Sequence, residues 1–265
     1  MSDRVSCTID GGIADVRLTR PEKRNAIDRE MLRAIIETGE RVGEDPSVRV
    51  VVFSGEGKGF CAGLDRELLA ASADPNLERD DRHAQFTGSI REDAVRAVMV
   101  WHDLPVPVIA AVHGAALGGG FQLALGADIR IVAPDAQLGV FEIRWGIVPD
   151  MGGTQLLPPL VGPDVAKELM FTSRPVSGIE AKELGLATRV SDNPRATAFE
   201  LAADIAGRNP DAIRVIKRLV DLSWGMSLAD GLRAERDLTE DILGSPNQVE
   251  AVRANLEQRP GDFAD

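Results

Sequence analysis

Two glycine-rich runs carry the backbone groups that are best suited to binding a negatively charged oxygen. They are residues 59–65 (GFCAGLD) and 113–121 (HGAALGGGF), and each follows an apolar run that is typical of a buried strand. Glycine leaves the neighbouring N–H groups accessible because it has no Cβ atom. The second run is also expected to open a helix, whose first N–H groups have no partner within the helix. Two such donors aimed at one point would form an oxyanion hole.

Two carboxylates lie in apolar stretches that follow these runs. Glu142 comes directly after LGVF, and Asp150 stands between WGIVP and MGGT. A charge in apolar surroundings is costly unless it serves a purpose, and burial moves the pKa of a carboxyl group towards values useful for proton transfer. Each is therefore a candidate base, although an isolated carboxylate is often a solvated surface ion. Asp150 could also cap a helix that begins near residue 152.

The sequence lacks the motifs of several other kinds of active or binding site. The spacing of the glycines after Gly114 does not give G-x-G-x-x-G, and no G-K-[ST] or G-x-S-x-G occurs. His113 precedes a glycine at a strand end, where a structural hydrogen bond is the expected role. Cys7 and Cys61 are too few for a disulfide framework, and the three histidines are not at ligand spacing, so no metal site is predicted.

Length and charge restrict the class of protein. The 265 residues are 44% hydrophobic and carry a formal net charge of −12, which argues against a nucleic-acid-binding surface but not against an anionic small ligand. No apolar run is long enough to span a bilayer. The first residues have no apolar signal-peptide core, so we expect a cytoplasmic protein.

The elements that must position these residues divide the chain into two parts. Strands are expected at 5–9 and 14–18 around a Gly11-Gly12 turn, followed by a helix capped by Asp28. Residues 66–90 are polar and weakly patterned, which indicates a mobile segment with a helical part. Further strands are expected at 48–53, 108–112, 129–133 and 138–141, and helices at 119–125, 195–207, 211–223, 227–243 and 246–257. This order predicts an α/β core over 1–190 and a helical module over 191–265.

Five segments together resemble the crotonase (enoyl-CoA hydratase/isomerase) superfamily. They are 20–26 (RPEKRNA), 59–65, 111–121, 127–130 (ADIR) and 146–154 (GIVPDMGGT). The resemblance implies a spiral of ββα units with a C-terminal helical module that forms trimers, often stacked as hexamers. It implies an acyl-CoA thioester as substrate. No cofactor is implied besides the coenzyme A that forms part of the substrate, and neither a nucleic-acid nor a membrane partner is expected.

The resemblance also assigns roles to residues. The oxyanion hole would consist of the N–H groups of Leu64 and Gly119, and the catalytic carboxylates would be Glu142 and Asp150. The residues implied to bind the substrate or its coenzyme A are Arg24, Ala26, Ala62, Leu64, Asp65, Arg66 and Gln122.

One departure from the family pattern bears on the reaction. Hydratases of the superfamily use two glutamates. The second matches Glu142 in this chain, but Gln122 occupies the position of the first. An amide cannot act as a general acid or base. The dienoyl-CoA isomerases of the superfamily place carboxylates at positions matching Glu142 and Asp150, with an Asp where Gln122 stands. The pattern favours double-bond isomerisation. A hydratase that uses Glu142 and a catalytically weak acyl-CoA-binding oligomer are the alternatives.

Overall fold

Two β-sheets form the centre of the chain in the computed structural model, which describes residues 4–72, 76, 78–84 and 89–265. The larger sheet has the strand order β1-β2-β3-β4-β6-β9. β1 and β2 are antiparallel, joined through Gly11 and Gly12 at positive φ, and the following neighbours pair in parallel. The strands are β1 (Val5–Asp10), β2 (Ile13–Leu18), β3 (Val50–Gly55), β4 (Val108–Val112), β6 (Ile129–Val132) and β9 (Arg189–Val190).

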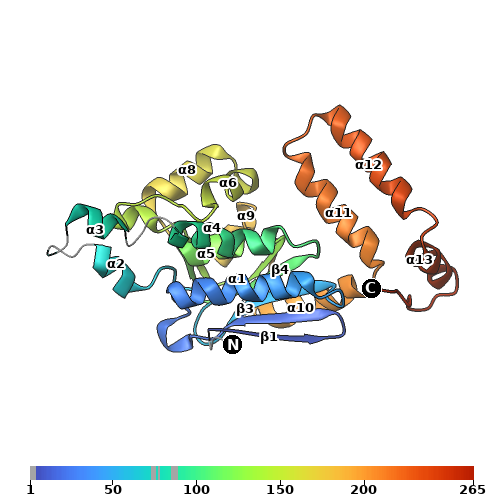
Figure 1. Ribbon diagram of the computed structural model, residues 1–265, viewed down its shortest axis with the longest axis horizontal. Coiled ribbons are helices and arrows are strands. Elements are labelled where there is room, and N and C mark those ends of the chain that lie inside the picture. The colour runs from blue at the N-terminus through green and yellow to red at the C-terminus, as the bar shows by residue number, and fades with distance from the viewer. Residues whose placement is uncertain (1–3, 73–75, 77, 85–88) are drawn as a thin grey trace.

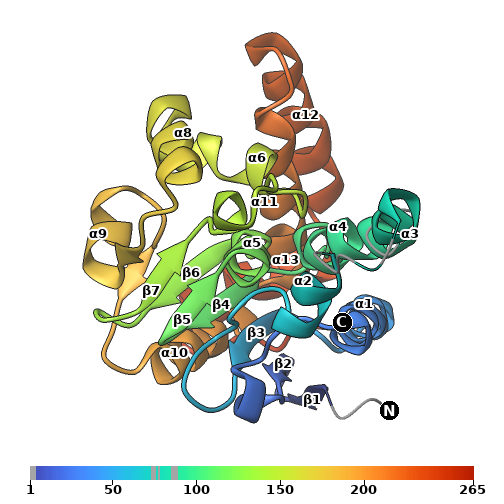
Figure 2. The same ribbon diagram turned by 90° about the vertical axis from the view of Figure 1, so that its left-hand side faces the viewer.

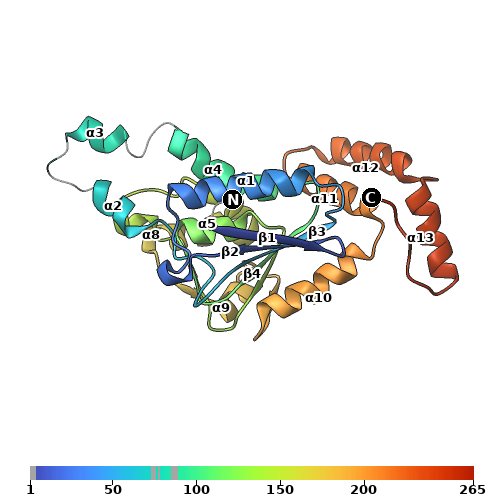
Figure 3. The same ribbon diagram turned by 60° about the horizontal axis from the view of Figure 1, so that its bottom comes forward.

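Helices cover both faces of the larger sheet, as Figure 3 shows. Alternate residues of β3 and β4 point to opposite faces. Val51 and Phe53 join the core that contains Met31 of α1 (Arg29–Glu44) and Trp101 of α4 (Ser89–His102). Val50 and Val52 instead pack with the alanines of α10 (Pro194–Ala206). The central strands read as continuous apolar runs because both of their faces are buried.

The second glycine run builds a smaller sheet as well as a helix. β5 (Ala115–Leu117) pairs in parallel with β7 (Gln137–Gly139), which pairs with β8 (Val176–Ser177), and α5 (Gly119–Leu125) begins directly after β5. Figure 2 shows β5 and β7 side by side near α5. The sequence predicted the helix but not β5, because three residues between glycines carry no periodic pattern. After β7 the chain forms η2 (Glu142–Trp145), α6 (Gly153–Leu156), α7 (Pro158–Val161), α8 (Pro163–Thr172) and, after β8, α9 (Gly178–Glu183).

The C-terminal helices extend away from the sheets, as Figure 1 shows. They are α11 (Pro210–Ser223), α12 (Leu228–Ile242) and α13 (Pro246–Leu256), with N-caps from Asn209, Ser227 and Ser245. The chain then folds back over α13, where Arg259 forms an ion pair with Glu250. α10 lies beyond the expected boundary at residue 190, but it packs on the larger sheet.

Between the first glycine run and α4, the described residues include the short helices α2 (Arg66–Ser72) and α3 (Arg79–Ala84). The expected mobile segment at 66–90 lies partly outside the described residues. Before it, the motif at 20–26 contains the 3-10 helix η1 (Pro21–Lys23). In the part of the chain that is described, no helix is both long enough and apolar enough to cross a bilayer.

Candidate active site

The first glycine run turns at Gly63, and the N–H of Leu64 is not used in the backbone hydrogen bonds of this turn. Gly63 has φ +87°, a conformation that glycine adopts without strain. Its carbonyl oxygen accepts a 2.8 Å hydrogen bond from the N–H of Ile27, and the Ile27 oxygen accepts a 2.9 Å bond from the N–H of Asp65. In a trans peptide the C=O and N–H groups point in opposite directions. The N–H of Leu64 therefore points away from Ile27 and takes no part in this bridge.

The N–H of Gly119 is directed in the same way. The oxygen of Gly118 accepts a 3.0 Å bond from the N–H of Gln122, so the N–H in the same peptide unit, that of Gly119, points out of the helix start. The two turns touch: a Cβ atom on Gly63 would lie 3.5 Å from the nitrogen of Gly119, and one on Gly120 would overlap the oxygen of Cys61. The structure thus brings together the two predicted donors, Leu64 and Gly119.

Both turns line a large cavity of about 1470 Å³. Its wall combines basic side chains with apolar ones, which suits a ligand that has an anionic part and an apolar part. The ion pair between Lys23 and Glu67, 2.9 Å long, brings the loop that carries Arg24 beside the start of α2 at Arg66. The basic residues are Lys23, Arg24, Arg66, Arg79, Arg91 and Arg144, and the apolar ones include Leu69, Ile90, Phe141, Trp145, Ile147 and Val148.

Glu142 is the buried carboxylate in the wall of this cavity. It is 6% exposed, and its Oε1 accepts a 2.6 Å hydrogen bond from Nε2 of Gln122, while its Oε2 is buried without a partner among the described residues. Burial raises the pKa of Glu142, and the charge of Asp150 raises it further, against the lowering effect of the Gln122 amide and backbone N–H groups. Oε2 is the oxygen available to take a proton.

Gln122 is held in one orientation. Its Oε1 accepts 2.9 Å bonds from the N–H groups of Met151 and Gly153, so its NH2 group must face Glu142. Gln122 is 1% exposed and is not among the described residues that line the cavity. The side chain of Gln122 thus orients Glu142, and the expected contact between Gln122 and the substrate stays a prediction.

Asp150 lies in the same cavity wall but is more exposed to solvent than Glu142. Its side chain is 39% exposed and lies 3.4 Å from Nε of Arg91, which is itself largely exposed. Its charge acts on Glu142, so the two carboxyl groups are close enough to interact. One carboxyl group is buried and the other is exposed to solvent. Environments that differ in this way allow two carboxyl groups to play different roles in proton transfer.

The other predicted contacts fall into two groups. Arg24, Ala26, Ala62 and Arg66 line the cavity, so their positions suit a role in substrate binding. Asp65 also borders it, but the residue is 4% exposed and its carboxylate is bound to Arg20. An acidic side chain that is already paired is unsuited to binding phosphate, and the expected contact of Asp65 with the substrate or its coenzyme A stays a prediction.

The remaining sequence predictions have plain structural outcomes. A ring nitrogen of His113 lies 3.0 Å from the oxygen of Gly57, which fits a structural role. Burial raises the pKa of the Cys61 thiol to about 12, so this thiol stays protonated. No group of three possible metal ligands occurs in the part of the chain described by the structure. Sequence reasoning did not single out Arg20 or Met151, although both belong to the quoted motifs.

The comparisons with known proteins agree with this architecture. The model of the enoyl-CoA hydratase/isomerase family matches residues 8–265. The chain is 36% identical to the Bacillus subtilis protein YngF, covering 98% of this chain and 97% of that one. It is 32% identical to mouse methylglutaconyl-CoA hydratase, covering 94% and 78%. An enoyl-CoA hydratase from Bacillus anthracis superposes with a TM-score of 0.89 at 31% identity, covering 98% of both chains.

Fold and comparisons together define an acyl-CoA-processing protein with the crotonase fold. More specifically, the chain belongs to the enoyl-CoA hydratase/isomerase family.

Proposed function

We propose that the protein moves a carbon–carbon double bond in an enoyl- or dienoyl-CoA. The observation that carries the proposal is the fixed amide of Gln122, which leaves Glu142 as the buried base and supplies no second acid beside it. Asp150 is a second carboxylate in the cavity wall, and its charge acts on Glu142. Such a pair can remove a proton at one carbon and return a proton at another.

The chemistry begins with the thioester oxygen bound by the N–H groups of Leu64 and Gly119. Oε2 of Glu142 removes a proton from the acyl chain, and the C–H electron pair delocalises through the conjugated carbons onto that oxygen as an enolate. Two aimed donors stabilise this charge, and the loss of one such donor typically costs ~2.7–4 kcal/mol. Asp150 then passes a proton from solvent to the far carbon, so the double bond moves and no water is consumed. The exposed side chain of Asp150 gives access to that solvent, and Glu142 releases the proton that it removed, so the number of protons is unchanged.

A hydratase is the second candidate, and the names of the relatives favour it. The mouse relative and the Bacillus anthracis protein are both named hydratases. In that case Glu142 would activate a water molecule, which adds across the double bond, and Asp150 would not be needed. A catalytically weak acyl-CoA-binding oligomer is the alternative from another class.

One experiment separates the three. The wild type, Glu142→Gln and Asp150→Asn are each incubated with a 3,5-dienoyl-CoA and with a 2-enoyl-CoA, and ligand affinity is measured by calorimetry. We expect isomerisation of the dienoyl substrate by the wild type and its loss in both variants with affinity retained. Conversion of the 2-enoyl substrate to the 3-hydroxy product, unaffected by Asp150→Asn, would refute isomerisation. Tight binding without turnover of either substrate would identify a binding protein.

The proposal includes a homotrimer, alone or stacked as a hexamer. Large apolar side chains are exposed on the C-terminal helices, and such a surface is expected to be covered by another chain. They include Ile216, Val220, Trp224, Leu228, Leu232, Val252 and Leu256. Light scattering tests the assembly, and a monomer would contradict it. The free thiols of Cys7 and Cys61 support the cytoplasmic location that we also propose.

A further inference from the structure

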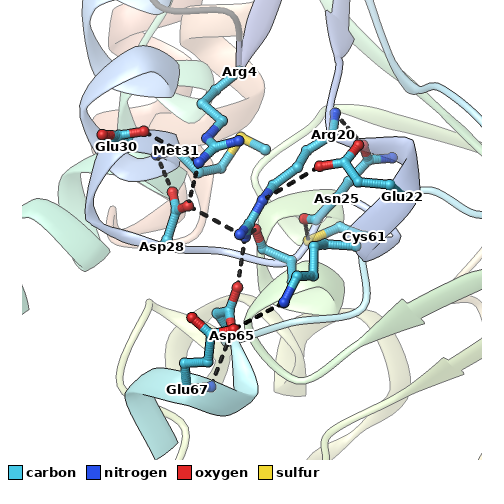
Figure 4. A network of polar contacts seen from close by, with 12 residues as sticks. Arg4, Arg20, Glu22, Asn25, Asp28, Glu30, Met31, Cys61, Asp65 and Glu67 are labelled. Carbon is cyan, nitrogen blue, oxygen red and sulfur yellow. Dashed lines mark hydrogen bonds and ion pairs between the residues drawn. The ribbon is translucent and has the colours of Figure 1, made fainter.

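A buried ion pair lies directly behind the turn that carries the N–H of Leu64. Arg20 is 8% exposed and Asp65 is 4% exposed, and Nη1 of Arg20 lies 2.6 Å from Oδ2 of Asp65 (Figure 4). The same nitrogen donates to the carbonyl oxygen of Ala26 at 3.1 Å and lies 3.2 Å from Oδ2 of Asp28. The guanidinium therefore ties the 20–28 loop to the first glycine run.

The N–H group and both carboxylate oxygens of Asp65 are hydrogen-bonded. Its N–H donates to the oxygen of Ile27, its Oδ2 accepts from Arg20, and its Oδ1 accepts a 3.0 Å bond from the N–H of Glu67. Burial alone would raise the pKa of Asp65, but the hydrogen bonds from Glu67 and Arg20 outweigh it and lower that pKa. The carboxylate is thus ionised, paired and fixed at the residue that follows Leu64.

The 20–28 loop is itself held rigidly against the glycine run. The side chain of Asn25 donates to the oxygens of Glu56, Gly59 and Phe60, each at 3.0 Å, and its Oδ1 accepts from the N–H of Arg20 at 2.9 Å. A loop fixed in this way is a stable support for a neighbouring peptide group.

The direction of the Leu64 N–H depends on this support. Its peptide unit is fixed on one side by the bond between Gly63 and Ile27, and on the other by the backbone and side chain of Asp65. Rotation of that peptide unit would turn the N–H away from the oxygen that it must bind. Gly119 has a different support, because its direction follows from the first hydrogen bond of α5.

We propose that Arg20 and Asp65 are positioning residues, which act through the Leu64 peptide unit to aim its N–H at the thioester oxygen. The role rests on the proposed oxyanion hole. It extends that proposal because neither side chain is needed to touch the substrate. Since the pair also fixes the loop that carries Arg24, binding of the nucleotide part of coenzyme A and alignment of the oxyanion donor share one rigid unit.

The test uses carbonyl polarisation as a readout that a purely structural role would not change. Butyryl-CoA labelled with 13C at the thioester carbonyl is bound to each protein, and the shift of its C=O stretch is measured by difference infrared spectroscopy. Its dissociation constant is measured by calorimetry, and kcat and KM are measured with the dienoyl substrate. The variants are Asp65→Asn, Arg20→Lys, Arg20→Met and the double variant R20M/D65L, which leaves no unpaired charge from this pair.

The matched control is Arg130→Met. Arg130 is as buried as Arg20 and donates to the backbone oxygens of Leu186 and Ala127, which are not among the described residues that line the cavity. We expect R20M/D65L to lose about 100-fold in kcat with KM and affinity nearly unchanged, because a misplaced group costs that much. The C=O shift should shrink in parallel, with Arg20→Lys and Asp65→Asn intermediate. Arg130→Met should lose stability but keep kcat and the C=O shift.

Two results would overturn the inference in distinguishable ways. A full C=O shift and kcat in the folded double variant would refute the positioning role and leave the oxyanion hole intact. The absence of any C=O shift in the wild type, with butyryl-CoA bound, would refute the oxyanion hole and the positioning role together. If the double variant does not fold, Asp65→Asn and Arg20→Lys decide by the same measurements.

Discussion

Replacing Gln122 by Glu would turn the best-defined hydrogen bond of the site into a repulsion. A carboxylate oxygen of the new side chain would still accept from the N–H groups of Met151 and Gly153, so we expect the local backbone to stay as it is. The atom that faces Oε1 of Glu142 at 2.6 Å would become a carboxylate oxygen. Two full charges at that separation repel by ~6 kcal/mol at an effective dielectric constant of ~20. At a pH at which Glu142 of the wild type is ionised, the two carboxyl groups of the variant should therefore share one proton.

The expected consequence is a shift in the pH dependence of activity. Burial already raises the pKa of Glu142 above 4.5, and the variant should raise it further. The acidic limb of kcat/KM for the dienoyl substrate should move to higher pH, with activity at neutral pH reduced and partly recovered in alkaline buffer. The pH dependence of the variant's stability follows from the same rise in pKa. A carboxyl pKa raised in the folded state leaves the variant as stable as the wild type at low pH and less stable as pH rises.

The assay is a pH series of kcat/KM together with urea unfolding at each pH. Gln137→Glu, which adds the same charge at an exposed position on β7, is the control. An acidic limb that coincides with that of the wild type would refute the argument that the Gln122 amide faces Glu142. The appearance of 2-enoyl-CoA hydration in Gln122→Glu would show that residue 122 selects between the two reactions.

Further predictions concern the turn, the second carboxylate and the C-terminal tail. Gly63→Ala should cost about 1–3 kcal/mol of stability because of the positive φ. Its Cβ would also overlap a backbone oxygen of β5, so kcat should fall far more than affinity; an unchanged kcat would contradict the oxyanion role. Asp150→Asn should lower the pKa of Glu142 and move the acidic limb of α-proton exchange in butyryl-CoA, measured in D2O by NMR, to lower pH. No movement would show that the two groups do not interact. The pKa of Glu250, lowered to about 2 chiefly by Arg259, predicts that the tail loosens as pH falls from about 4.5 towards 2, which limited pepsin digestion should detect. Equal cleavage of the wild type and Arg259→Ala across that range would contradict this.

Many of the helices and strands could be predicted from local sequence patterns. Asp28 accepts a hydrogen bond from the N–H of Met31, as its capping position predicted. The strands of the larger sheet other than β9 and the long C-terminal helices occur near their expected places, because continuous apolar runs and helical spacing are local signals. β5, β8 and β9 were not predicted, since strands of two or three residues form only when a neighbouring strand supplies their partners.

The sequence by itself determined the family-typical glycine turns, the carboxylates Glu142 and Asp150, and the replacement of a glutamate by Gln122, since these depend only on residue type and spacing. Only the tertiary structure decided the direction of the Gln122 amide and the pairing of Asp65 with Arg20. The physical reason is that a side chain's role depends on partners brought close by folding. Arg20 is 45 residues from Asp65 in the chain, and Gln122 is 29 residues from Met151, so no local pattern could have joined them.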